Sequence, residues 1–266
     1  MDDQLRMMFT CCHPAISADS QVALTLKTLC GFGIPEIAKA FLTTEENINK
    51  RLVRARQKIR EDKIPFEVPE GNLEARLDAV LETIYLLFNE GYSASKGNDL
   101  IRYELCEEAI RLCEIMESHP ALQNKSNIYA LLSLMHLNAC RFKSRTDADG
   151  NILTMAEQDR SVWDRTLMQK GFQYLEKSTI EKTLSIYHIL AAISAYHCAA
   201  TEFESTDWKG ILDLYDNLTQ VDHSPLVLLN RAIAVSKVHG VSKALHELDK
   251  IKDTVSMTSY HLFYST

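Results

Sequence analysis

The sequence predicts an all-α fold, and three observations lead to this prediction. Only 9 glycines and 6 prolines occur among the 266 residues, so long stretches lack helix-breaking residues. Apolar residues recur at spacings of three and four along nearly the whole chain, as they do on one face of a helix. Runs of β-branched residues are short. With 46% hydrophobic residues, the chain has enough apolar material to bury substantial cores.

A break in the helical pattern divides the chain into two units. Pro65, Pro69 and Gly71 lie close together, and they favour an extended, stiff connection over a continuous helix. We therefore expect an N-terminal domain at residues 1–63, a linker at 64–71 and a C-terminal domain at 72–266.

The N-terminal domain is expected to contain a compact pair of helices behind a longer one. An apolar helix is predicted at residues 21–30, and Gly31 ends it. A short helix follows at residues 34–42. Thr43 and Glu46 then have the spacing of a capping box, which predicts the start of the next helix. Together these signals read as helix, tight turn, helix.

The second helix of this pair has one apolar stripe, formed by Ile48, Leu52, Ala55 and Ile59 at spacings of four, three and four. From residue 50 to residue 60 the chain carries six cations and no acid. Such a helix suits the major groove of DNA, with its early residues at base edges and its later cations on phosphates. The predicted DNA contacts are Asn47, Asn49, Lys50, Arg51 at the edge of the stripe, Arg54, Arg56 and Lys58.

The local charge contrasts with the rest of the protein. Residues 1–69 carry 10 Lys+Arg against 9 Asp+Glu, while the remaining chain carries 19 against 27, which together give the formal net charge of −7. A helix rich in lysine and arginine is often only a solvated face. The combination of a basic stripe with a helix-turn-helix pattern favours contact with a nucleic acid.

The C-terminal domain is predicted to be a stacked array of helices. Residues 106–112 and 241–248 each resemble the second helix of a tetratricopeptide unit, in which Ala109 and Ala244 would permit a close helix crossing. Residues 230–240 resemble the first helix and turn of the last unit. Because the repeat spacing is irregular, we predict a tetratricopeptide-like helical array. Its helices are expected at 73–89, 103–116, 128–142, 158–175, 183–201, 210–218, 225–238 and 241–251.

No metal site or disulfide framework is predicted. The seven cysteines are odd in number and irregularly spaced, as reduced core thiols are. Cys11 and Cys12 are adjacent, so they do not easily converge on one tetrahedral ion, and His13 does not change this. Residues 147–151 resemble the start of a calcium loop, but Ile152 and Gln158 stand where such a loop needs glycine and glutamate. We expect a polar turn there.

The sequence offers no candidate for catalysis. His136, His188 and His197 lie among apolar helical residues, where a histidine is more often a core group, and none has a nucleophile beside it. Trp163 and Trp208 are expected to anchor helix packing or to line a peptide groove. We therefore predict no enzyme activity, no catalytic residue and no cofactor.

The chain is expected to be cytoplasmic. No run of about 18 apolar residues occurs, as a membrane span would need. The first residues lack the basic and apolar regions of a secretion signal. No membrane contact is predicted.

Several segments resemble one group of bacterial RNA polymerase sigma factors, the extracytoplasmic-function sigma factors with a tetratricopeptide-like C-terminal extension. The first, at residues 2–16, reads DDQLRMMFTCCHPAI and is similar to the opening of the promoter-binding domain. Taken in this order, the strings are specific to that group. The others lie at 21–26, 36–42, 51–60, 64–66, 88–92, 108–112, 158–164, 206–208 and 229–232.

The resemblance implies a role in transcription initiation. It implies that the N-terminal domain recognises the −35 promoter element and docks on the flap of core RNA polymerase, and that the exposed face of the second helix carries the contacts. The C-terminal domain would regulate activity or bind a protein or peptide partner. Such sigma factors also carry a preceding domain that melts the −10 element. Either this chain is cut from a longer protein, which we expect, or it does not initiate transcription alone.

Two alternatives remain at this point. The chain could be an adaptor whose helical array holds a peptide or protein, with only incidental DNA contact by the basic helix. Alternatively, the acidic C-terminal domain could contact the basic helix directly and hide its DNA face, a contact that high salt would weaken.

Overall fold

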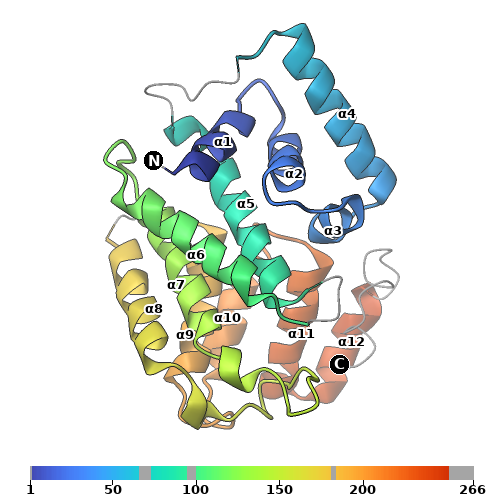
Figure 1. The fold of residues 1–266 in the computed structure, drawn as a ribbon. Coiled ribbons are helices and arrows are strands. Elements are labelled where there is room, and N and C mark those ends of the chain that lie inside the picture. Colours follow the sequence, from blue (N-terminus) through green and yellow to red (C-terminus); the bar gives the residue numbers. More distant parts are fainter. Residues whose placement is uncertain (1, 66–72, 95–99, 181–183, 252–266) are drawn as a thin grey trace.

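The all-α prediction is confirmed by the computed structural model, which describes residues 2–65, 73–94, 100–180 and 184–251. These residues form twelve α-helices and two short 3₁₀-helices, and an isolated bridge between Thr146 and Ile152 is their only β-type pairing. Figure 1 shows α1–α4 gathered at one end and the longer series of helices at the other. Of the predicted linker at 64–71, only Ile64 and Pro65 belong to the described residues.

Four helices make up the N-terminal part. The first was not foreseen from the sequence, and it begins where the Asp2 carboxylate accepts from the amides of Gln4 and Leu5. Gly31 follows the second helix and has a φ of 73°. The sequence analysis expected this glycine to end the helix. The four are α1 (Asp3–Cys11), α2 (Ala18–Thr28), α3 (Ile34–Ala40) and α4 (Glu45–Glu61).

The start of α4 differs from the prediction by one residue. Thr44, not Thr43, caps the helix, because its Oγ1 accepts from the Asn47 amide at 3.3 Å. Thr43 instead accepts from the Asn47 side-chain amide at 3.1 Å. The predicted Thr43–Glu46 capping box is therefore wrong. Two consecutive threonines each satisfy the sequence rule, and only the backbone decides between them.

Ten further elements form the C-terminal part. Most predicted helices are found within a few residues of the expected bounds. The prediction for 158–175 is wrong in its first turns, since Asp164 caps a helix that begins only at Arg165. The elements are α5 (Glu74–Tyr92), α6 (Tyr103–Ser118), α7 (Ser126–Ala139), η1 (Phe142–Ser144), η2 (Arg160–Val162), α8 (Arg165–Ser178), α9 (Ile186–Ala199), α10 (Trp208–Leu218), α11 (Pro225–His239) and α12 (Val241–Ile251).

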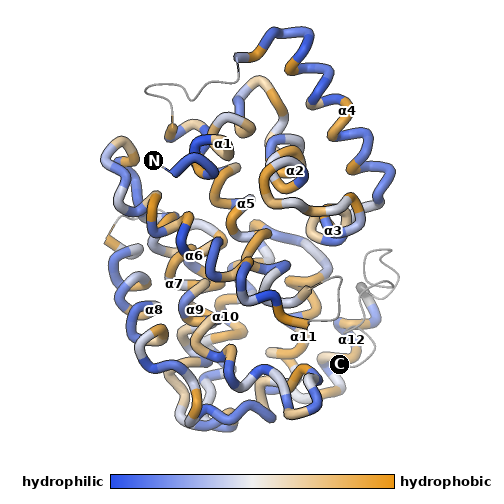
Figure 2. Tube along the Cα trace, viewed as in Figure 1, coloured by the Kyte–Doolittle hydropathy of each residue, from blue (hydrophilic) through white to orange (hydrophobic). Residues whose placement is uncertain are grey.

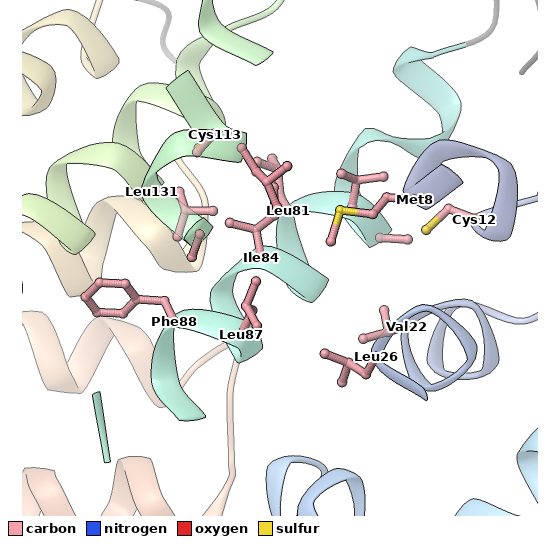
Figure 3. Packing of buried hydrophobic residues seen from close by; sticks show 14 of the residues in the cluster. Met8, Cys12, Val22, Leu26, Leu81, Ile84, Leu87, Phe88, Cys113 and Leu131 are labelled. Atoms are coloured by element: carbon pink, nitrogen blue, oxygen red, sulfur yellow. The ribbon is translucent and has the colours of Figure 1, made fainter. Parts of the chain in front are cut away.

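Helix α5 packs on both groups of helices. Figure 3 shows Met8 and Leu26 on one side of α5 and Cys113 and Leu131 on the other, and all belong to one continuous buried cluster. Polar contacts cross the same seam. The buried Arg76 of α5 donates from Nη1 to the carbonyl oxygen of Phe9 at 2.7 Å. The core of the N-terminal part is therefore completed by a helix of the C-terminal part.

The residues considered for metal or calcium binding are held by local contacts. Cys11 and Cys12 are buried, and their Sγ atoms lie 3.8 and 3.7 Å from the hydroxyls of Thr28 and Thr25. The Asp147 carboxylate accepts from the backbone and side chain of Asn151, which closes a polar turn. Among the described residues, no group of three or more His, Cys, Asp or Glu side chains could hold a metal ion.

The histidines and tryptophans singled out from the sequence take part in helix packing. His188 contacts the hydroxyls of Ser126 and Ser185, and Trp163 donates from Nε1 to Ser144 at 2.8 Å. Trp208 packs edge-on against His197 and Phe203. Figure 2 shows α5 as largely hydrophobic and α4 as mainly hydrophilic. No helix in the described part of the chain combines the length and apolar character needed to cross a bilayer.

Candidate nucleic-acid interface

Helix α4 lies at the edge of the molecule, with one face buried and the other free. Ile48, Leu52 and Ala55 are 0 to 2% exposed, as the predicted stripe requires. These side chains pack toward α2 and α3, which hold the helix in place. In Figure 1, α4 stands away from α5–α12, so its outer face is open to solvent.

Most of the predicted cations of α4 point outward. Lys50, Arg54, Arg56 and Lys58 are all exposed. Lys58 pairs with Asp62 at 2.7 Å, and this hydrogen bond raises the pKa of the lysine. Arg54 and Arg56 have no ion pair with any residue that the structure describes. Among the predicted contacts, these two are therefore the cations most readily available to an anionic partner, and the exposed Arg60 is equally unpaired within the described residues.

Arg51 is oriented differently from the other cations. Its guanidinium lies 3.1 Å from the Asp19 carboxylate of α2 and 5.1 Å from the centre of the Phe41 ring. Its side chain is only 28% exposed. Arg51 thus ties α4 to α2 and to the end of α3, and only part of its charge faces solvent.

The two asparagines lie near the start of α4. Asn47 is exposed, and its side chain donates to Thr43. Asn49 is also exposed and borders a shallow hollow on the helix surface. Both occupy the end of the helix that, in helix-turn-helix proteins, approaches base edges.

The centre of the exposed face is formed by four residues, of which the sequence prediction included only Lys50. Each precedes a residue of the buried stripe by two positions, roughly 200° around the helix, and so lies opposite the core. All are exposed, Val53 to 60%. Glu46, Val53 and Gln57 follow from the same helical periodicity that places the buried stripe. This central row consists of Glu46, Lys50, Val53 and Gln57.

A second hollow lies between α4 and the beginning of α2. Ser17 and Ser20 border it on one side, and Arg54 and Lys58 border it on the other. The first amides of α2 face no side-chain cap from Ser17, whose hydroxyl bonds to Ser20 at 2.9 Å instead. Cations such as Arg54 and Lys58 contact phosphates in protein–DNA complexes, but the carboxylates of Asp19 and Glu61 line the same hollow.

A cavity of about 480 Å³ lies between the helix-turn-helix and the C-terminal part. Phe41 and Leu42, at the turn between α3 and α4, line one wall. Tyr85 and Leu86 of α5 and Leu190 of α9 contribute to the others, together with residues of α10 and α11. The turn that precedes the basic helix thus borders the same cavity as the helical array.

The hypothesis that the acidic C-terminal part covers the basic helix gains no support from the ion pairs. Within the described residues, Lys50 pairs with Glu46, Arg51 with Asp19 and Lys58 with Asp62. Every one of these partners lies in the N-terminal part. In the described part of the chain, no ion pair joins the basic face of α4 to the C-terminal part.

A comparison with known families gives a match in the N-terminal part. Its helix-turn-helix coincides with a family model described as Sigma-70, region 4, which matches residues 6–59. This segment is similar to sigma-70 region 4. The match supports a sigma factor family and covers α1 to α4 almost completely. Region 4 is a helix-turn-helix domain, in agreement with the geometry of α3 and α4.

The other comparisons extend beyond region 4. Residues 76–179 match a family of unknown function (DUF6596). An uncharacterized protein of Rhizobium meliloti (strain 1021) is 38% identical over 262 residues, which cover 98% of this chain and 61% of the relative. The chain thus spans less than two thirds of that relative's length. No solved structure matches this chain.

Proposed function

We propose that this chain belongs to a bacterial extracytoplasmic-function sigma factor, that its region 4 recognises the −35 promoter element, and that it docks on core RNA polymerase. The observation that carries the proposal is the open, cationic face of α4 on a helix-turn-helix that matches sigma-70 region 4. The protein would act in the cytoplasm and perform no chemistry of its own.

The positions along α4 suggest a division of roles. Asn47, Asn49 and Lys50 lie in the first turns, where a recognition helix meets base edges. Arg54, Arg56 and Lys58 follow, where cations meet phosphates. Arg51 combines a partial DNA contact with its brace to Asp19. We propose these seven residues as the DNA-binding set.

The proposal for the C-terminal domain, residues 72–266, is that it forms a tetratricopeptide-like array that regulates region 4 or binds a protein or peptide partner. Ala109 and Ala244, the small residues of the repeat-like segments, are both buried. Gly171 of α8 approaches α7 so closely that an added Cβ would lie 2.6 Å from the Leu137 side chain. Close crossings of this kind are typical of stacked helical repeats. The cavity beside Leu42 offers a route by which a partner could influence α4.

The test is selection of bound duplexes from a random pool by the full chain, repeated across a salt series. Enrichment of one motif, with binding that weakens as salt rises, is the expected result. The variant Lys50→Ala/Arg54→Ala is expected to lose this enrichment and to reduce the salt slope by about 1, because only Arg54 of the two is assigned to a phosphate.

The matched control is Lys209→Ala/Lys243→Ala, which removes two exposed cations from the C-terminal part. It is expected to bind as the parent does. If no motif is enriched at low salt, or if both variants behave alike, the adaptor function becomes the better explanation. Co-purification with core RNA polymerase then distinguishes a sigma factor from an adaptor of another complex.

A further inference from the structure

Val53 is an apolar side chain in the middle of a polar surface. It is 60% exposed, and the hollow around it is lined otherwise by Glu46, Asn49, Lys50 and Arg54. The remaining apolar residues of α4 lie on the opposite face, where Ile48 and Leu52 are buried. Val53 therefore adds little to the core, and packing does not explain an apolar residue at this position.

The major groove offers one apolar group that such a side chain can recognise. The C5 methyl of thymine projects into the groove, and the other bases present only hydrogen-bonding atoms at their edges. A protein that contacts this methyl needs a short apolar side chain between polar ones. Val53 has this character, with Asn49 and Lys50 one turn before it and Arg54 next to it.

We propose that Val53 is a specificity-determining residue, whose methyl groups contact the C5 methyl of one thymine in the DNA site. This inference rests on the proposed function, because it requires α4 to enter the major groove. It goes beyond that function by naming an apolar contact within a face of cations. Lys50 and Arg54, on either side of Val53, then reach the neighbouring base edges and the backbone.

Deoxyuridine provides the test, because it lacks only the methyl group of thymidine. Each thymine of the duplex selected by the full chain is replaced in turn by deoxyuridine, and the dissociation constant is measured. One position is expected to weaken binding about fourfold, as burial of one methyl group predicts. With Val53→Ala, the same replacement is expected to have almost no effect, while Val53→Ile retains the preference.

Two outcomes separate this inference from the proposed function. If the chain selects a salt-sensitive motif but tolerates deoxyuridine at every position, the Val53 contact is overturned and promoter recognition stands. A preference for thymine that persists unchanged in Val53→Ala overturns it equally. If no motif is selected at all, both proposals fail. Equal thermal melting of the variants and the parent excludes misfolding, which the exposure of Val53 also makes improbable.

Discussion

Lys50 and Glu46 form an ion pair one helical turn apart on the outer face of α4, with Nζ 2.7 Å from Oε1. Both side chains are more than half exposed. A pair in this setting adds little to stability, because solvent screens it. Its importance lies in its position. Glu46 neutralises the charge of Lys50, which would otherwise attract the phosphates of DNA.

Glu46→Gln is therefore expected to strengthen non-specific DNA binding at low salt. The change releases Lys50 and removes a negative charge from the central row, so the salt slope steepens by about 1. Fluorescence anisotropy with a random duplex measures the effect. Glu45→Gln removes the same charge from the neighbouring exposed position, which has no ion pair among the described residues, and serves as the control. An equal effect of both changes would contradict a special role for the Glu46–Lys50 pair.

Arg51→Ala is expected to lower stability as well as DNA affinity. The substitution removes the pair with Asp19 and the contact with Phe41, which together join α4 to α2 and α3. A loss of about 1 kcal/mol corresponds to roughly 2–4 °C in Tm for a protein of this size. Thermal unfolding followed by circular dichroism gives the value. Lys50→Ala, which removes a more exposed charge, is expected to melt with the parent, and the prediction fails if the two variants melt together.

Lys63→Gly is expected to stabilise the end of α4. Lys63 has φ of 48°, in the left-handed region that glycine adopts freely and other residues adopt at a cost of roughly 1 kcal/mol. The Ile64 amide bonds back to the Ile59 carbonyl oxygen at 3.0 Å, which closes the helix through this conformation. Urea unfolding measures the gain. Lys63→Ala removes the same charge without freeing the backbone, and a similar gain there would point to charge instead of conformation.

The protein is expected to lose stability below pH 6.5 because of one buried histidine, His136, and one half-buried histidine, His197. Burial, aided by Lys170, lowers the pKa of His136 from 6.5 to about 4. Burial, with Arg141 and Arg160, lowers that of His197 to about 3. Since the unfolded rings take up protons first, each favours unfolding by up to about 1.4 kcal/mol per pH unit between pH 6.5 and its folded pKa.

Urea unfolding at pH 7 and pH 5.5 tests this dependence. His136→Phe is expected to reduce the loss of stability, because the phenyl ring does not titrate. The carboxylate of Glu114, 3.7 Å from Nε2, faces a neutral ring near pH 7 and does not form a charged pair with it. His246→Gln, at an exposed position, should leave the pH dependence unchanged. An unaltered slope in His136→Phe would show that this ring is protonated equally in both states.

Much of the fold follows from local sequence, and the exceptions have physical reasons. The stripe through Ile48, Leu52 and Ala55 predicts the buried face of α4, because helical periodicity alone fixes it. The cap of α4 is less certain from sequence, since Thr43 and Thr44 both satisfy the rule. The orientation of Arg51 depends on Asp19, which is distant in sequence and close only after folding.

The interface itself was only partly predictable. The run of lysine and arginine residues predicted that α4 carries the interface. The helical periodicity of its apolar residues showed which positions are buried and so cannot contact DNA. Val53 and Glu46 were not included, because an apolar residue and an acid do not stand out as nucleic-acid contacts in a list of residue types. They acquire significance only from their place at the centre of the exposed face.

The position of α5 has a consequence for how this protein is divided in experiments. Met8 and Leu26 belong to the same buried cluster as Leu81 and Ile84 of α5, so the N-terminal helices lack part of their core without α5. A graft of the helix-turn-helix onto another protein should therefore extend at least through Tyr92, and not stop at the proline-containing segment. The smallest transferable module is larger than the family match at 6–59. Packing against α5 sets its limit, and the proline-containing segment after α4 does not.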